Sequence, residues 1–352
     1  MNSLNPLLSR RRALQGITTL AGLGLAGSVL TSCAGSTTGP DGLRRVRLTQ
    51  AVNSLAYAQN YIAQRAGYFR DVGLAVETVV TDGGGPDVQA VLAGSAGFTI
   101  NDGGQVITAL SGNRRLTAVA ATFDRCLVNA TISVRTAQRL GIDATTPLPR
   151  KLAVLPELRI GVTAPGALTW QIARFNLVGA GADPDSATLV ALGGGPAVLA
   201  ALESDQVDVI YISVPFGEQA VQRGTGLTLI DHSAGEDPTL SRFMMEGLWV
   251  RPGDIEEDRE SIVGMVTALQ RASTFIRTAS PEEIADVLQP DFTAFGREVL
   301  LAAVERLKGA VPADGRWDAT AQATTERVLR TNGLLRPDAP PLASIVEDRF
   351  LT

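Results

Sequence analysis

The sequence predicts an α/β protein of two lobes, each built on a doubly wound sheet, with two crossover strands joining the lobes. Strand-like runs alternate with helical runs along most of the chain. A glycine-proline unit occurs twice, at 83–86 and 193–196, each time between a strand-like run and a helical run. Two apolar extended runs, at 126–135 and 242–251, fit neither half. We interpret these runs as paired crossover strands that form a hinge.

The first 33 residues predict an export signal rather than part of the fold. A basic stretch at 10–12 precedes a Gly-rich apolar run and the phrase "LTSC", which ends at Cys33. The arginines resemble a twin-arginine signal, but Ala13 stands where that motif prefers Phe, so general secretion stays open. "LTSC" resembles a lipobox, which implies lipidation of Cys33. An uncleaved membrane anchor is the alternative, and the short, Gly-rich run disfavours it.

Residues 34–43 are small and predict a flexible tether. The signal carries three arginines and no acids, so its removal changes the formal charge from −5 to −8. An acidic chain of this kind argues against nucleic acid as a partner. With Cys33 lipidated, Cys126 would have no disulfide partner. We expect Cys126 to be a small buried hydrophobe.

The first half alternates between runs rich in branched residues and runs with apolar residues three and four apart. The expected strands are 44–52, 74–80, 97–100 and 116–123. The expected helices are 54–73, 87–93 and 103–112. This order predicts βαβ units and a parallel sheet.

The pattern restarts near residue 158 and gives a second half of similar order. The expected strands are 158–164, 186–192, 207–213 and 227–231. The expected helices are 167–181, one after the second glycine unit, and 216–224. Amphipathic helices follow at 256–279, 281–289, 296–309 and 318–333, and we expect them to return to the first half. Lobe 1 would then be 44–125 plus 243–352, and lobe 2 would be 126–242.

A known family can be named at the segment Tyr57–Val79, "YAQNYIAQRAGYFRDVGLAVETV". Gly67-Tyr68-Phe69 and the following "GLAVE" resemble the opening of the NMT1/THI5-like periplasmic substrate-binding proteins of the nitrate, sulfonate and taurine type. The resemblance covers residues 44–250. It implies the type II periplasmic-binding-protein fold and a monomeric receptor, lipid-anchored on the extracytoplasmic face of the cell membrane. Such a receptor closes on a small solute and delivers it to the permease and ATPase of an ABC importer.

Strand ends and helix starts supply the candidate ligand-binding residues. Glycines before a helix allow close approach of the backbone, and free N–H groups there favour an anion or a carbonyl-like acceptor. The alternative for each glycine unit is a tight strand–helix turn. Ligands in open α/β sheets sit beyond the carboxyl ends of the strands. The candidates at such positions are Ser54, Tyr57, Gly84, Gly85, Asn101, Asp102, Thr163, Gly166, Thr169, Trp170, Gly194, Ser213, Phe216 and Glu246.

Several candidates have two interpretations. Tyr57 and Trp170 would stack on a flat ligand or pack in the core. Arg125 would pair with an anion or form a surface ion pair. Glu246 would face the cleft, which favours a ligand with amino donors, or face solvent. The ligand itself stays open among sulfonates, taurine, nitrate and aminopyrimidines.

Two rival functions remain beside the receptor. An enzyme on the same fold, with thiamine-pyrimidine-type chemistry, would depend on histidine and lysine. The chain has one histidine, His232, and two lysines. It shows no Ser-His-Asp arrangement, metal-ligand cluster or phosphate loop, so we expect no catalytic residue, metal or cofactor. The other rival is a ligand-sensing pair of lobes.

Overall fold

The computed structural model describes residues 37–81, 83–110, 114–337 and 339–351. The predicted signal peptide, Cys33 and the start of the predicted tether lie outside the described residues. Within the described part, no helix is both long enough and apolar enough to cross a membrane.

The first sheet has six strands, in which β2 pairs with β1, β3 and β4, and β11 lies between β4 and β5. The strands β2, β3 and β4 are parallel, and β11 is antiparallel to both of its neighbours. The strands are β1 (Thr37–Thr38), β2 (Arg44–Gln50), β3 (Leu74–Val80), β4 (Phe98–Asn101), β5 (Thr117–Phe123) and β11 (Glu246–Val250).

The described part of the predicted tether is not an extended linker. Thr37 and Thr38 form β1 and pair antiparallel with Arg45 and Arg44 of β2. The connection turns back through Gly42, which has a φ of 76°, a value that glycine adopts without strain. The fold therefore begins several residues before the predicted first strand.

The second sheet has five strands in the order β10-β6-β9-β7-β8. The strand β7 is parallel to β8 and β9, whereas β6 is antiparallel to β9 and β10. The strands are β6 (Val128–Ser133), β7 (Arg159–Val162), β8 (Thr188–Ala191), β9 (Val209–Ser213) and β10 (Gly226–Ile230). Two such sheets confirm the predicted two-lobe α/β class, with the difference that the first sheet includes the antiparallel strands β1 and β11 and the second includes β6.

The two apolar runs predicted as paired crossovers are strands of different sheets. The strand β6 lies in the second sheet, between β10 and β9. The strand β11 lies in the first sheet, between β4 and β5. Only the short segments before these strands contact each other. The Phe243 N–H donates to the carbonyl oxygen of Asp124 over 2.8 Å, and Arg242 pairs with the Asp124 carboxylate. These two segments are the crossings between the sheets.

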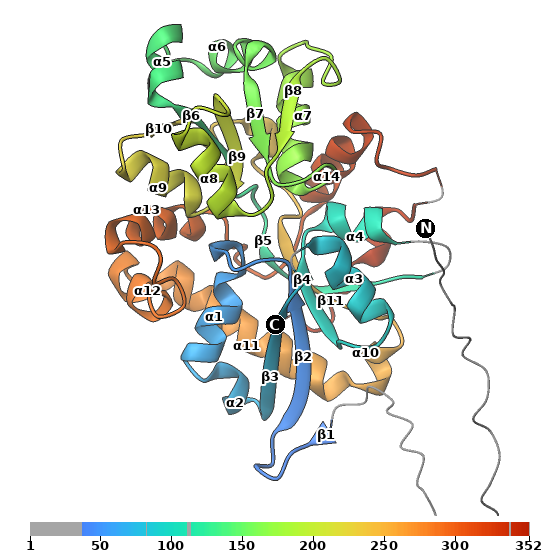
Figure 1. Ribbon diagram of the computed structural model, residues 1–352. Helices are drawn as coiled ribbons and strands as arrows, with labels where there is room; N and C mark the ends of the chain where they lie inside the picture. Colours follow the sequence, from blue (N-terminus) through green and yellow to red (C-terminus); the bar gives the residue numbers. More distant parts are fainter. Residues whose placement is uncertain (1–36, 82, 111–113, 338, 352) are drawn as a thin grey trace, which may run out of the picture. The chain divides into compact units, whose positions relative to one another are not determined.

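Helices cover both faces of the first sheet. One face carries α1 and α2, which were predicted as one helix; Gly67, with a φ of 75°, separates them. The other face carries α3 and α4 (Figure 1). The helices of this half are η1 (Leu55–Tyr57), α1 (Ala58–Arg65), α2 (Tyr68–Asp71), α3 (Gly84–Leu92) and α4 (Gly103–Ala109).

The second sheet carries α7 on one face and α8 and α9 on the other. The helices α5 and α6 were not predicted from the sequence. For α5 the reason is that Val134 and Thr136 prolong the branched pattern of β6. Ser133 caps α5, and Gly141 ends it with a φ of 63°. The helices are α5 (Val134–Leu140), α6 (Leu148–Ala153), η2 (Leu155–Glu157), α7 (Leu168–Gly179), α8 (Gly195–Glu203), α9 (Phe216–Gln222) and η3 (Pro238–Leu240).

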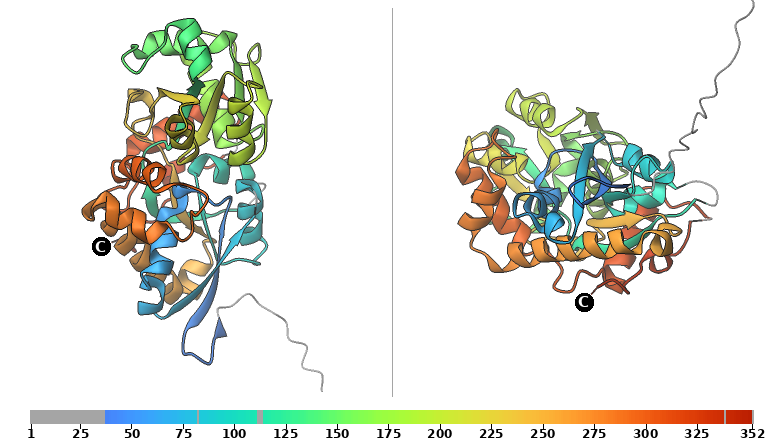
Figure 2. Two further views of the ribbon diagram at one scale, coloured as in Figure 1. Left: turned by 60° about the vertical axis from the view of Figure 1, so that its left-hand side comes forward. Right: turned by 90° about the horizontal axis from the view of Figure 1, so that it is seen from below.

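The C-terminal helices return to the first sheet, but two of them also contact helices of the second. The long helix α11 runs beside α1 and α2, and α12 follows it (Figures 1 and 2). In contrast, α13 contacts α9, and α14 contacts α7. The C-terminal elements are α10 (Asp254–Glu257), α11 (Arg259–Thr278), α12 (Pro281–Leu288), α13 (Arg297–Lys308), α14 (Ala319–Thr331) and η4 (Leu342–Ile345).

Candidate functional site

Four predicted site residues lie at the carboxyl-terminal edge of the first sheet. Tyr57 follows β2, and Asn101 ends β4 with Asp102 directly after it. Glu246 begins β11, which is antiparallel, so Glu246 lies at the same edge, opposite Phe123 at the end of β5. Tyr57, Asn101, Asp102 and Glu246 are all buried. Glu246 is therefore not solvent-exposed, which was the alternative open at the sequence level.

Of three buried carboxylates at this edge, two act on the third. Burial raises the pKa of Glu246 well above its ordinary value, and the charges of Asp102 and Asp87 raise it further. Burial also raises the pKa of Asp102 to about 7 and that of Asp87 to about 7. We call Asp87, Asp102 and Glu246 the acidic cluster. Burial, Glu246 and Asp87 in turn raise the pKa of Tyr57, which is packed in the core.

Asp87 was missed at the sequence level, although comparing the two glycine units would have found it. The first unit continues as "GGGPDV" and the second as "GGGPAV". Thr81 and Asp87 of the first unit therefore correspond to Ala191 and Ala197 of the second. The structure joins this pair, with Thr81 Oγ1 2.6 Å from Asp87 Oδ1. The two units therefore differ at these two positions, where the first unit has polar side chains and the second has alanines.

Backbone conformation and close packing explain why the second unit contains glycines. Gly193 has a φ of 86°, which strains other residues. A Cβ on Gly195 would lie 2.2 Å from the ring of Phe216. The neighbouring candidate Gly194 is the exposed N-cap residue of α8. In the first unit, Gly84 and Gly85 begin α3, and a Cβ on Gly85 would meet no atom within 4 Å.

The candidates of the second sheet make contacts among themselves. The hydroxyl oxygens of Thr163 and Thr169 lie 2.7 Å apart, and Thr169 Oγ1 also accepts from the Thr163 N–H. Trp170 is half-buried, with the guanidinium of Arg174 4.5 Å from its ring centroid. In this structure the two threonine hydroxyls satisfy each other, and an arginine covers Trp170.

Polar contacts join the strand-end loops of the two sheets. Ser54 Oγ donates to the carbonyl oxygen of Val214 over 3.1 Å. Gln105 Nε2, from α4, donates to the carbonyl oxygen of Gly166 over 3.2 Å. The predicted residues Ser54 and Gly166, which are far apart in the sequence, thus lie where the two halves meet.

Gln171 is a second residue that the sequence analysis did not select. Its Nε2 donates to the same Gly166 carbonyl over 2.9 Å, whereas its Oε1 is buried without a hydrogen-bond partner. The point where a Cβ on Gly104 would stand is 3.1 Å from Asp102 Oδ1 and 3.4 Å from Gln171 Oε1. Two acceptor oxygens, one from each half, therefore converge above Gly104.

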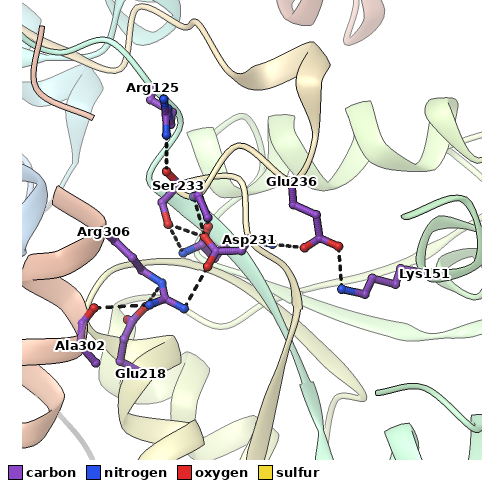
Figure 3. Close-up of polar contacts among 10 residues, drawn as sticks. Arg125, Lys151, Glu218, Asp231, Ser233, Glu236, Ala302 and Arg306 are labelled. Carbon is purple, nitrogen blue, oxygen red and sulfur yellow. Dashed lines mark hydrogen bonds and ion pairs between the residues drawn. The ribbon is translucent and has the colours of Figure 1, made fainter. Parts of the chain in front are cut away.

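The remaining candidates lie apart from the acidic cluster. Ser213 ends β9 opposite Val128. Phe216 packs edge-on against Phe295, with ring centroids 5.2 Å apart. Arg125 Nη1 donates to the carbonyl oxygen of Ser233 (Figure 3). Among the described residues Arg125 has this hydrogen bond and no salt bridge, and pairing with an anionic ligand stays a prediction.

Figure 3 shows an ion network between α13 and the second sheet. Arg306 lies 2.9 Å from Glu218 Oε1 of α9 and 3.0 Å from Asp231 Oδ2. Nearby, buried Lys151 pairs with Glu236 over 2.6 Å. Burial raises the pKa of Glu218, and the charge of Arg306 opposes that rise. Glu218, the buried carboxylate of this network, therefore has a cationic partner.

His232 and Cys126 are interior residues. His232 is fully buried, with Nδ1 2.7 Å from the Val128 carbonyl oxygen and Nε2 3.0 Å from Asn176 Oδ1. Cys126 is a buried free cysteine, as predicted. Lys308 contacts the carbonyl oxygen of Ala279, and Lys151 pairs with Glu236.

A surface hollow of about 540 Å³ lies elsewhere, between α2, α11 and the loop before α14. Tyr68 and Arg271 line it, and the Arg271 guanidinium stacks 4.1 Å from the Tyr68 ring centroid and pairs with Asp71. None of the predicted site residues lines this hollow.

Comparison with solved structures shows the same fold in proteins of low sequence identity. A protein from Bordetella bronchiseptica RB50 is 21% identical, with a TM-score of 0.72 over 87% of this chain and 95% of the other. The alkanesulfonate-binding protein SsuA from Xanthomonas axonopodis pv. citri, bound to MOPS, is 14% identical, with a TM-score of 0.65 over 86% of this chain and 98% of the other. The periplasmic nitrate-binding protein NrtA from Synechocystis PCC 6803 is 15% identical, with a TM-score of 0.64 over 88% of this chain and 86% of the other.

These likenesses confirm the two-lobe fold of periplasmic binding proteins. No curated protein matches the sequence. The sequence profile of the NMT1-like family matches residues 45–289, which is well over half of the chain. The chain therefore belongs to the NMT1-like family.

Proposed function

We propose that the protein is an extracytoplasmic solute-binding lipoprotein that serves an ABC importer. The observation that carries this proposal is the meeting of strand-end loops from two sheets, through Ser54 and Val214 and through Gln105 and Gly166. The carboxyl ends of strands are where α/β folds hold ligands. Membership of the NMT1-like family, and the binding proteins for alkanesulfonate and nitrate that share the fold, support it.

We assign residues 44–125 plus 243–352 to lobe 1 and 126–242 to lobe 2, and the lobes close on one small solute. The monomer would present the closed form to a permease and its ATPase. The ligand-binding residues are drawn from the strand-end candidates of both lobes, with Ser54, Asp102, Gly166 and Glu246 nearest to the junction.

An enzyme of the thiamine-pyrimidine type fits the contacts less well. The single histidine, His232, is buried away from solvent between Val128 and Asn176. A general base has to reach the proton that it removes. Lys151 is buried against Glu236 and is equally unable to reach a ligand at the strand ends. Nothing in the structure favours the sensor over the receptor.

Solute binding is tested by following the melting temperature across a broad panel of sulfonates, inorganic anions, amines and aminopyrimidines. A ligand that binds only the folded protein at 100 times its dissociation constant stabilises it by about 2.7 kcal/mol. We expect at least one class to raise the melting temperature. A flat response to the whole panel would contradict the receptor.

Lipid anchoring is tested by expressing the full chain with radiolabelled palmitate. We expect label in the wild-type protein and none in Cys33→Ala. Cys126→Ala is the matched control, because Cys126 is buried and free, and it should keep the label. Label that persists in Cys33→Ala would overturn the lipobox assignment.

A further inference from the structure

The acidic cluster lies at the junction where the proposed function places the solute. Asp102 directly follows β4, Glu246 begins β11 at the same edge, and Asp87 lies in the first turn of α3, which follows β3. Asp87 is fully buried, and Asp102 and Glu246 are each 4% exposed. The strand-end loops of the second sheet reach this edge through Gly166.

Among the residues that the structure describes, no arginine, lysine or histidine forms an ion pair with the acidic cluster. The charges that act on Glu246 are those of Asp102 and Asp87, and both are negative. Glu246 Oε2 and Asp87 Oδ2 are buried without a hydrogen-bond partner. Two other buried acids, Glu218 and Asp124, pair with Arg306 and Arg242. Buried Asp237 has no ion pair among the described residues either, but it accepts hydrogen bonds from Thr239 and Asn176. An unpaired buried carboxylate is costly when it is ionised, which is why burial raises the pKa values of these acids, and a bound cation would allow them to ionise.

An independent observation points to a donor-rich ligand at the same place. Gln171 is fully buried, its amide nitrogen is bonded to Gly166, and its unpartnered Oε1 converges with Asp102 Oδ1 above Gly104. Gln171 comes from α7 and Asp102 from the loop after β4, so each half contributes an acceptor. Asp102 Oδ1 already accepts from the Gln105 N–H, so Gln171 Oε1 is the acceptor of this pair that still lacks a donor.

The helix starts at this edge, where an anion would bind, are already occupied by carboxylates. Asp102 caps α4 by accepting from the Gln105 N–H over 2.8 Å. Asp87 stands in the first turn of α3. The hydroxyls of Thr163 and Thr169 bond to each other, and Ser54 donates to Val214. Ser54 and one of the two threonine hydroxyls therefore already donate within the protein, and nearby carboxylates would repel an anion.

A metal ion does not fit the spacing of the acids. Among the described residues, no three or more His, Cys, Asp or Glu side chains stand close enough together to hold one. An organic cation with several N–H groups reaches acceptors that a single metal ion cannot bridge. Ammonium, amidinium and guanidinium groups form charge-assisted hydrogen bonds with carboxylates.

We propose that the solute is an organic cation whose N–H groups are bound by Asp102, Glu246 and Gln171, with Asp87 adding negative charge. This inference rests on the proposed receptor function and narrows its ligand to amines, amidines and guanidines. It separates this chain from the sulfonate- and nitrate-binding proteins that share its fold.

Paired probes of similar shape and opposite charge test the inference on the purified full chain at pH 8 and low salt. One pair is benzamidine and benzoate, and the other is ethylamine and ethanesulfonate. Solute released by denaturing the purified protein is also identified by mass spectrometry in both polarities. We expect the cation of a pair to raise the melting temperature and the released solute to carry a basic nitrogen.

Failure of the inference and failure of the receptor function give different results. Stabilisation by the anions alone, or a released solute without basic nitrogen, would overturn the cation and keep the receptor. No response to any probe, to the broad panel of solutes, and no released solute would overturn both.

Variants show whether the acidic cluster makes the contact. We expect Glu246→Gln and Asp102→Asn each to weaken binding of the stabilising cation at least tenfold while the ligand-free melting temperature stays equal or rises. A purely structural role would instead lower that melting temperature. Glu282→Gln, on the exposed side of α12, is the matched control and should change neither quantity. Unchanged cation affinity in both cluster variants would overturn the assignment.

Discussion

Asp102 does two jobs with one side chain, because it caps α4 and, when ionised, adds to the negative charge that acts on Glu246. Asp87 shares the second of these roles. In the ligand-free protein such groups reduce stability in their ionised form, and natural proteins retain residues of this kind where function needs them. The acidic cluster should therefore lower the stability of the empty receptor.

The substitution Asp102→Asn should stabilise the ligand-free protein in a pH-dependent way. Burial raises the pKa of Asp102 from 3.8 to about 7, so between these values the folded protein holds the proton more tightly than the unfolded chain does. The stability that this proton contributes is lost as the pH rises from about 4 to about 7. Asparagine keeps a cap acceptor and loses nothing over that range.

Melting temperatures measured between pH 4.5 and 7.5 check this prediction. We expect the two proteins to differ little at the acid end and the asparagine variant to melt higher at the neutral end. Glu282→Gln again serves as the control, and its profile should follow that of the wild type. Parallel profiles for Asp102→Asn and the wild type would contradict the raised pKa of Asp102 in the folded protein.

The sequence allowed only part of the site to be predicted. Asp102 was selected because it follows a predicted strand, and Glu246 was selected as a carboxylate within an apolar crossover run. Gln171 was missed because nothing in a helical sequence shows which amide oxygen stays unpaired; that depends on how the two halves meet. Thr163 and Trp170 contact near neighbours in the sequence, Thr169 and Arg174. Side-chain rotamers decide whether such contacts form, and the sequence does not show the rotamers.

At the scale of elements, the two glycine units look alike in sequence and differ in surroundings. The unit before α8 packs against Phe216, and the unit before α3 is open and carries Asp87. The alternation of strands and helices was predictable because period and turn residues are local. The break between α1 and α2 depended on the backbone conformation of Gly67, and α5 depended on capping by Ser133 against a branched pattern.

Alanine at the third glycine of each unit should have unequal effects. In Gly195→Ala the new Cβ would stand 2.2 Å from the Phe216 ring, which itself packs against Phe295. Overpacking of this kind costs about 2 kcal/mol. Gly85→Ala meets no atom within 4 Å and should cost nothing, because alanine favours a helix over glycine.

Denaturant unfolding of the two glycine variants beside the wild type measures the difference. The midpoint should fall for Gly195→Ala and stay or rise for Gly85→Ala. Equal effects at the two positions would mean that the packing against Phe216 does not distinguish the units.

At the scale of the whole molecule, α13 and α14 tie the C-terminal segment to both sheets. Sequence periodicity predicted these helices and their return to the first half, but their contacts with α9 and α7 could not be predicted. Such contacts join residues far apart in the chain, as Arg306 and Glu218 show. Helical spacing shows which face is apolar and not which neighbour covers it.

Removing Arg306 should destabilise the protein more than removing a surface arginine. In Arg306→Leu, Glu218 would keep its charge in a site where its side chain is 6% exposed and lose its nearest cation. We expect a loss of about 2 kcal/mol or more in the free energy of unfolding, because a buried charge is left unpaired. Arg349→Leu breaks a pair with Glu256 whose side chains are 42% and 69% exposed, and should cost about 0.5 kcal/mol or less.

Urea unfolding of both arginine variants gives the comparison. Adding Glu218→Gln to Arg306→Leu should recover most of the loss, since it removes the stranded charge. A double variant no more stable than the single one would show that Arg306 acts through packing and not through Glu218.

The backbone hydrogen bond from Phe243 to Asp124 means that the chain leaves the first sheet and returns to it at one place. In engineering terms, residues 125–242 form a cassette with adjoining ends. An insert taken from a relative would start and finish at this one place, and its counterparts of α9 and α7 would also have to fit α13 and α14. Recombination would therefore exchange residues 125–242 as one block and leave the acidic cluster with the rest of the chain.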